Sequence, residues 1–108
     1  MIRIVLGASL LVTSTLPAAA QAYVGTWATS AEQCRIGQEE ENAPLILKAN
    51  RSDQHEAHCT FSSVTKRGAT WNVKARCVVE GNNQAATFTL QVSGDTLIRD
   101  GETLVRCR

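Results

Sequence analysis

Two cysteines, Cys59 and Cys77, are placed symmetrically about Gly68, in two segments that alternate apolar and polar residues. Directly opposed residues of an antiparallel hairpin have residue numbers with a constant sum, and a loop centred on Gly68 gives the sum of 136 that these cysteines share. The two thiols should therefore face each other across neighbouring strands, within reach of a disulfide. This feature predicts a strand register, one buried face of a sheet and an oxidising compartment.

The start of the chain predicts a cleavable secretory signal over residues 1–22. Met1-Ile2-Arg3 carries one positive charge, the apolar run from Ile4 to Val12 follows, and small residues lead to Ala20-Gln21-Ala22. This order is typical of a signal peptide, and the apolar run is too short for a membrane-spanning helix, which needs about 20 residues. We expect cleavage after Ala22, a periplasmic or secreted location, and no membrane span in the mature chain.

The mature part, residues 23–108, has the size of a single domain and keeps all four cysteines. Small domains bury a modest fraction of their surface, and secreted ones commonly add disulfides. Loss of Arg3 with the signal leaves ten of the 11 basic residues, against ten acidic residues. A net charge near zero gives no general reason to expect nucleic acid or an anionic membrane as a partner.

The middle of the chain predicts three long antiparallel strands. Every odd position from 69 to 79 is apolar and most even positions are polar, which is the period of a half-buried strand. A loop over 81–84 gives the next hairpin a sum of 165, with Cys77 opposite Phe88 and Ala75 opposite Leu90. The residues expected on the inner face are Ala57, Cys59, Phe61, Ala69, Trp71, Val73, Ala75, Cys77, Val79, Ala86, Phe88, Leu90 and Val92.

The flanking regions predict shorter elements and complete the fold class. In chain order they are a strand over 24–29, a helical turn near 30–35 that Ser30 caps, a polar loop over 35–44, a strand over 45–49, a turn-like segment over 50–54, and two last strands over 96–99 and 102–108. We therefore expect an all-β domain of about six or seven strands in an antiparallel meander. Its architecture should be a small barrel or a strongly curled sheet.

The last two strands are harder to assign to faces. If Leu97 and Leu104 face inward, Arg99 and Arg106 also turn inward, because side chains two positions apart share a face. A β-bulge near one of the turns would relieve this conflict, although the sequence does not locate it.

The cysteines allow three pairings, and the hairpin register selects Cys59–Cys77, which leaves Cys34–Cys107. The second bond would join the segment after the first strand to the last strand, and would fasten the seam of a closed meander. A metal site is the alternative, but zinc sites usually contain closely spaced cysteine pairs, which this chain lacks. A redox-active C-x-x-C motif is also missing from the sequence.

Other residues that could carry chemistry form weak patterns. His55 and His58 are three apart, which places them on opposite faces of a strand, and Ser62 and Ser63 stand in no nucleophile motif. The acidic run Glu39–Glu41 is most simply a solvated loop, because neighbouring carboxylates in a loop have no controlled separation. We therefore expect a non-enzymatic protein with no cofactor and no metal.

A basic patch is the candidate partner-binding surface. Lys66 and Arg67 lie at the expected hairpin tip, and Lys74 and Arg76 lie on the outward face beneath it. They could orient an acidic partner, although a solvated outer face that resists aggregation is the simpler interpretation. The two tryptophans are expected to be core anchors, and we expect truncation of Trp71 to destabilise the fold more than truncation of Trp27.

Gly25-Thr26-Trp27 near the mature start, a cysteine soon after it and an antiparallel meander resemble the lipocalin-like bacterial inhibitors of secreted metalloproteases. The resemblance implies a tryptophan packed inside the barrel and a periplasmic binding or inhibitory role. Those inhibitors insert a stretch that precedes G-x-W into the protease cleft, whereas only Tyr23 and Val24 precede it here. The chain also resembles small uncharacterised periplasmic proteins with G-T-W-A, four cysteines and a terminal R-C, which implies fold and location only.

These patterns together favour a secreted or periplasmic binding module whose partner is a protein of the cell envelope. The alternative is a small-ligand carrier, which requires an open space inside the barrel. Inward-facing Phe61, Trp71 and Phe88 are expected to fill that space.

Overall fold

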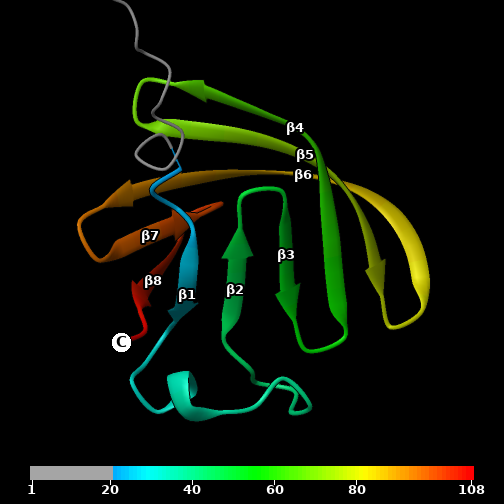
Figure 1. Cartoon of the computed structure of the whole chain (residues 1–108), viewed down its shortest axis with the longest axis vertical. Coiled ribbons are helices and arrows are strands. Elements are labelled where there is room, and N and C mark those ends of the chain that lie inside the picture. Colours follow the sequence, from blue (N-terminus) through cyan, green and yellow to red (C-terminus); the bar gives the residue numbers. More distant parts are fainter. Residues whose placement is uncertain (1–20) are drawn as a thin grey trace, which may run out of the picture.

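The computed structural model describes residues 21–108, in which an antiparallel meander closes into a barrel with strand order β1 to β8 (Figure 1). The predicted all-β class and the two predicted disulfides are confirmed. The predicted signal lies outside the described residues except for its last two positions. The elements are β1 (Gly25–Ala28), the 3-10 turn η2 (Gln33–Arg35), β2 (Leu45–Lys48), β3 (Arg51–Gln54), β4 (Ala57–Arg67), β5 (Thr70–Val79), β6 (Asn82–Ser93), β7 (Thr96–Arg99) and β8 (Glu102–Arg106).

Strand β3 is an element that the sequence did not predict, because its residues are all polar. Its backbone pairs with β2 on one side and β4 on the other, so the segment 50–54 is largely a strand rather than a turn. Ser52 points inward and is buried, while Arg51 and Asp53 form an ion pair on the outer face. A strand whose one buried residue is a serine shows no apolar alternation, so the sequence predicted six or seven strands where residues 21–108 form eight.

The hairpin of β4 and β5 confirms the opposition of Cys59 and Cys77, but its loop is not centred on Gly68. Pairs from Ala57 to Phe61 keep the sum of 136, and from Ser63 onward the pairs sum to 137. A β-bulge at Ser62 accounts for the shift. The loop is therefore Gly68-Ala69, and Ala69, which was expected inside, is exposed.

The predicted register of β5 and β6 is wrong. The observed pairs sum to 161, with Cys77 opposite Gln84 and Trp71 opposite Leu90. The turn lies at Glu80-Gly81, where φ is 51° and 86°, the positive values that a two-residue hairpin turn of this type requires. Because the register differs from the predicted one by an even number of residues, every side chain keeps its predicted face.

Strands β7 and β8 pair without a bulge, so the predicted relief of the two inward arginines is wrong. Arg106 instead lies over the Trp27 ring, with its guanidinium carbon 4.3 Å from the ring centroid, and donates a hydrogen bond to the Val24 carbonyl. A Cβ atom at Gly25 would lie 2.6 Å from Nη1 of Arg106, so glycine leaves the room that this stacking needs. The arginine is thus accommodated by an aromatic face and a backbone oxygen.

Aromatic side chains fill one part of the barrel. Trp27 is 0% exposed and its indole N–H donates to the Tyr23 carbonyl at 2.8 Å, while the Tyr23 and Trp71 rings meet edge-on at 5.3 Å. Trp71 is 6% exposed, so both tryptophans are buried and Trp71 is not the deeper one. The Cys34–Cys107 bond joins η2, which follows β1, to the residue after β8, and β1 pairs with β8, so the bond fastens the seam as predicted.

Candidate functional site

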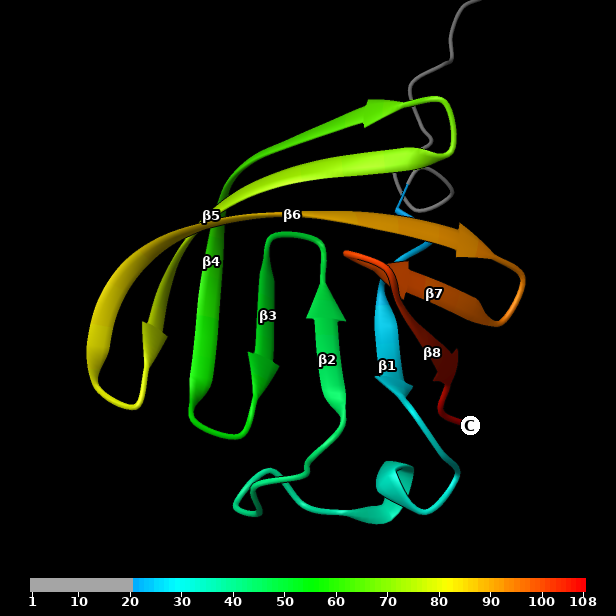
Figure 2. The same cartoon turned by 180° about the vertical axis from the view of Figure 1, so that it is seen from behind.

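The barrel wall is incomplete beside β6. Strand β7 pairs with β6 only from Leu90 to Ser93, so the part of β6 from Asn82 to Phe88 has a paired neighbour, β5, on one side only. In Figure 2, β6 crosses the molecule above the hairpin of β2 and β3, and no strand is drawn over that hairpin. A cavity of about 410 Å³, which we call the wall groove, opens here. Its lining residues are Leu45, Leu47, Ser52, Gln54, Ala57, Cys59, Ala86, Thr87, Phe88, Arg99, Asp100 and Glu102.

The floor of the wall groove is mainly apolar. Leu45 and Leu47 of β2 are 3% and 1% exposed, and Cys59 of β4 brings the disulfide to the surface of the cavity. Phe88 meets the Phe61 ring edge-on at 5.7 Å but is only partly buried. Phe88 thus points inward and packs against the core, as expected, but it does not close the space beside it, and its ring forms one side of an open groove.

Ser52 places a polar atom in this apolar surface. Its side chain lines the groove and the residue is only 7% exposed, and within residues 21–108 its hydroxyl has no hydrogen-bond partner. A buried hydroxyl without a partner is destabilising by about 1–3 kcal/mol. A ligand atom or a water molecule in the groove would satisfy it. Sequence reasoning missed this residue because it missed the strand that carries it.

The rim of the groove carries charges that are already engaged. The Arg99 guanidinium contacts the Glu102 carboxylate at 3.0 Å. The Asp100 carboxylate accepts hydrogen bonds from the Thr89 amide at 2.9 Å and the Thr89 hydroxyl at 3.3 Å. The sequence analysis treated an inward Arg99 as a conflict with a buried face. In the structure Arg99 lies at the mouth of the groove, where its charge is paired and stays hydrated.

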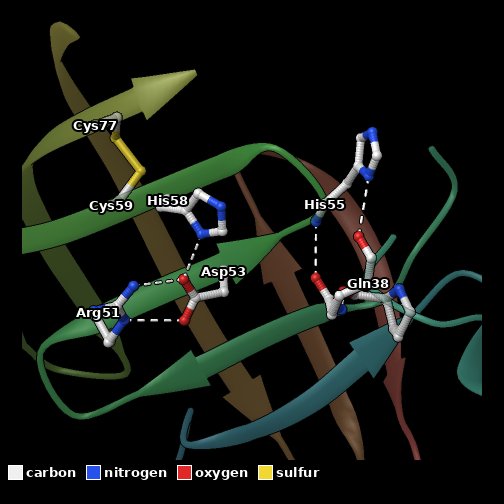
Figure 3. A network of polar contacts seen from close by, with 8 residues as sticks. Gln38, Arg51, Asp53, His55, His58, Cys59 and Cys77 are labelled. Atoms are coloured by element: carbon white, nitrogen blue, oxygen red, sulfur yellow. Dashed lines mark hydrogen bonds and ion pairs between the residues drawn. A yellow bond between two sulfur atoms is a disulfide. The ribbon is translucent and has the colours of Figure 1, made fainter. Parts of the chain in front are cut away.

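A polar network lies on the outer face of β3 and β4 (Figure 3). Asp53 accepts two hydrogen bonds from Arg51, at 2.6 and 3.0 Å, and its Oδ1 lies 2.7 Å from Nδ1 of His58. The hydrogen bond from Arg51 is the main reason that the pKa of Asp53 falls to about 2, with a smaller contribution from His58. The network orients an imidazole beside a carboxylate.

That network lacks the remaining groups of a hydrolytic site. Within residues 21–108 no serine hydroxyl is bonded to His58, and the Ser62 hydroxyl donates to the Lys74 carbonyl at 3.1 Å. His55 lies in the turn before β4, where its amide donates to the Gln38 side chain, so the two histidines do not meet. Among the residues that the structure describes, no group of three or more metal-ligating side chains is gathered. The arrangement suits a structural clamp on β3.

The structure separates the four basic residues of the predicted patch. Lys74 and Arg76 point outward from β5, and Arg67 lies opposite Thr70 on the same face. Lys66 lies opposite Trp71, and its Nζ is 5.1 Å from the centroid of that ring, so it belongs to the other face of the ribbon. All four are exposed, and in the described part of the chain the three outer ones take part in no ion pair.

Comparisons of the chain with models of known families, with characterised proteins and with solved structures produced no match. Over residues 21–108 the structure contains no helix long and apolar enough to cross a membrane. The two disulfides are compatible with an oxidising compartment. The geometry of the wall groove and its surroundings is therefore the basis for inferring a function.

Proposed function

We propose that this chain is a non-enzymatic binding module of the periplasm or the cell exterior, and that it takes its ligand in the wall groove. The observation that carries the proposal is the open cavity of about 410 Å³, with apolar walls and the buried hydroxyl of Ser52 in its lining. Binding sites generally have volumes of about 300–1,000 Å³ and combine apolar walls with a few polar groups that fix orientation. The wall groove has both properties.

A segment of another protein is the ligand that we favour. One side of the groove is formed by β6, whose stretch from Asn82 to Phe88 pairs with a strand of residues 21–108 on one side only. An inhibitor-like role is also what the G-x-W resemblance implies. A small-ligand carrier is the second candidate, which the depth of the cavity down to the buried Leu47 supports. Among residues 21–108 no serine hydroxyl is hydrogen-bonded to His58, which favours a role without catalysis.

Two adjacent alanines provide a matched test. Ala86 lines the groove, whereas Ala85 lies opposite Arg76 on the outer face of the same strand. Ala86→Trp should occlude the groove, and Ala85→Trp adds the same side chain outside it. We expect uptake of 1-aminoanthracene, a small uncharged fluorophore, to weaken by at least about tenfold in the first variant and to be unchanged in the second.

The same pair of variants tests protein binding. The wild type and each variant would be immobilised and incubated with cell-envelope extract, and the retained proteins would be identified by mass spectrometry. A partner held by the wild type and by Ala85→Trp, and lost by Ala86→Trp, agrees with the proposal. If Ala86→Trp takes up the fluorophore and retains the same partners as the wild type, the groove is not the binding site.

The outer basic face remains a second candidate surface for an acidic partner. Arg67, Lys74 and Arg76 are exposed cations on one face, and the structure gives a matched control in Lys66, which lies on the other. Reversing Arg67 and Arg76 to glutamate should weaken salt-dependent capture of an acidic partner, and reversing Lys66 should not. If Lys66→Glu weakens capture of the partner equally, the outer basic face is not a specific binding surface.

A further inference from the structure

The edge of β6 beside the groove carries unpaired backbone groups. Thr89 donates its amide to the Asp100 carboxylate at 2.9 Å, and its carbonyl accepts from the Asp100 amide at 3.2 Å, so the Thr89 backbone points away from β5. Backbone groups two residues apart on a strand point the same way. The amides and carbonyls of Asn83, Ala85 and Thr87 therefore face outward along the edge, where no strand of residues 21–108 pairs with them.

This edge lacks the usual protection. From Asn82 to Ser93 the strand contains no charged residue and no proline. Natural sheet edges are normally blunted by charges, prolines, bulges or covering segments, because an open edge pairs with other chains. Within residues 21–108, Asp100 is the one group bonded to this edge, at Thr89, and the edge from Asn83 to Thr87 stays open.

The edge and the wall groove are continuous. Ala86 and Phe88 point from β6 into the groove, while Thr87 between them belongs to both its lining and the open edge. A strand added beside β6 would place residues opposite Ala86 and Phe88 on the same side as those two, directly over the groove. Strand β7 ends at Arg99, opposite Leu90. The added strand would occupy the position beside β6 that a longer β7 would have filled.

We propose, on the basis of the proposed binding function, that the ligand is an extended segment of a partner protein that adds to β6 as an antiparallel strand. Its alternate side chains enter the wall groove, and these are apolar apart from one hydroxyl or amide that reaches Ser52. The segment is uncharged on that side, because the one cation at the rim, Arg99, is already paired with Glu102. This mode supplies main-chain hydrogen bonds for affinity and side-chain pockets for specificity.

The test begins with a library of random linear heptapeptides displayed on phage and selected against the folded protein. We expect the selected sequences to alternate apolar and polar residues. One selected peptide is then synthesised with a single N-methyl group at each position in turn. Methylation of the amides that face β6 should weaken binding by about tenfold or more, and methylation of the intervening amides should leave it within about twofold.

A substitution in the protein provides the complementary measurement. Ala85→Pro removes an outward amide from the edge, whereas Ala85→Ser keeps it, and neither changes a residue that lines the groove. We expect the peptide to bind Ala85→Pro about tenfold more weakly and Ala85→Ser as well as the wild type. If the proline variant does not fold, the N-methyl series still decides the question with the wild-type protein.

The outcomes separate this inference from the proposed function. Peptide binding without the alternating N-methyl effect, or equal binding to Ala85→Pro, overturns strand addition. Uptake of 1-aminoanthracene with no peptide selected also overturns it, and leaves a small-ligand site. A dimer that Ala85→Pro abolishes would make a second copy the occupant, against the proposal. If neither the fluorophore nor any peptide binds, both the inference and the proposed function are wrong.

Discussion

Two regions of this barrel are packed differently. Around Tyr23 and Trp27 the inward side chains are large, and the bond between Cys34 and Cys107 closes the wall beside them. Around Ser52 and Ala86 the small inward side chains lie over a floor of Leu45 and Leu47, and the wall is open along β6. The difference shows that a small barrel is hollow where its inward residues are short, even when the strand pattern alternates perfectly.

The two disulfides test this contrast most strongly. Cys34–Cys107 fastens the filled half and spans 73 residues, whereas Cys59–Cys77 lies beside the groove and spans 18. The chain-entropy model assigns about 4.4 kcal/mol to the longer closure and about 3.2 kcal/mol to the shorter one. Replacing each pair by alanines and measuring urea unfolding should therefore show the larger loss for the seam bond. Equal losses would mean that the seam is strained or already held by β1 and β8.

Aromatic truncation compares the halves directly. Trp27→Ala removes a fully buried ring and its hydrogen bond to Tyr23, and should lower the free energy of unfolding by about 4 kcal/mol. Phe88→Ala removes a partly buried ring at the groove and should lower it by about 2 kcal/mol, since part of that ring is already in solvent. Denaturant titration of both variants measures this. A larger loss for Phe88→Ala would place the main core at the groove.

The sequence predicts the filled half well and the open half poorly. Alternation placed Trp71, Val73 and Leu90 on the inner face, and these assignments hold although the register was shifted by four residues, because an even shift preserves faces. The groove depends on β3, whose polar composition resembles a turn, and on where β7 stops. The residue at which a short strand ends is set by tertiary contacts, such as the hydrogen bond between Thr89 and Asp100. A local sequence pattern does not predict such contacts.

One signal for the groove was present in the sequence. The inward positions expected near one end of the long strands included the small residues Ala57, Cys59 and Ala86, whereas Trp71 and Leu90 stood towards the other end. Once the register is known, these small residues lie together and cannot fill the interior of the barrel beside them. Adding up the volumes of the inward side chains, rather than counting the apolar ones, would have predicted a cavity at that end of the barrel.

The outer face of β3 should add a pH-dependent contribution behind the groove. The pKa of Asp53 is held at about 2, below its usual 3.8, chiefly by the hydrogen bond from Arg51. Because the folded-state pKa is lowered, the stabilisation is fully present above about pH 4 and is lost as the pH falls towards 2. We expect about 1–2 kcal/mol, since Arg51 is 44% exposed and solvent screens the pair.

Asp53→Asn isolates that contribution. In this variant the unfolding free energy should change less between pH 5 and 2 than in the wild type, by the amount that Asp53 contributes. Thermal or urea unfolding at several pH values measures the difference. If the two profiles are parallel, the Arg51 and His58 contacts do not stabilise β3, and its place in the barrel depends on backbone pairing alone.

The smallest expected effect is also the one most specific to the groove. Because the Ser52 hydroxyl has no protein partner within residues 21–108, Ser52→Ala should leave the unfolding free energy unchanged or raise it by up to about 1 kcal/mol. Ser62→Ala is the matched control, because it removes a hydroxyl that donates to the Lys74 carbonyl, and should lower the unfolding free energy by about 0.5–1 kcal/mol. If Ser52→Ala is instead destabilised by more than about 1 kcal/mol, the hydroxyl is already satisfied in the free protein. It would then be a structural residue of β3, and the groove would offer its ligand apolar contacts and the backbone edge of β6 alone.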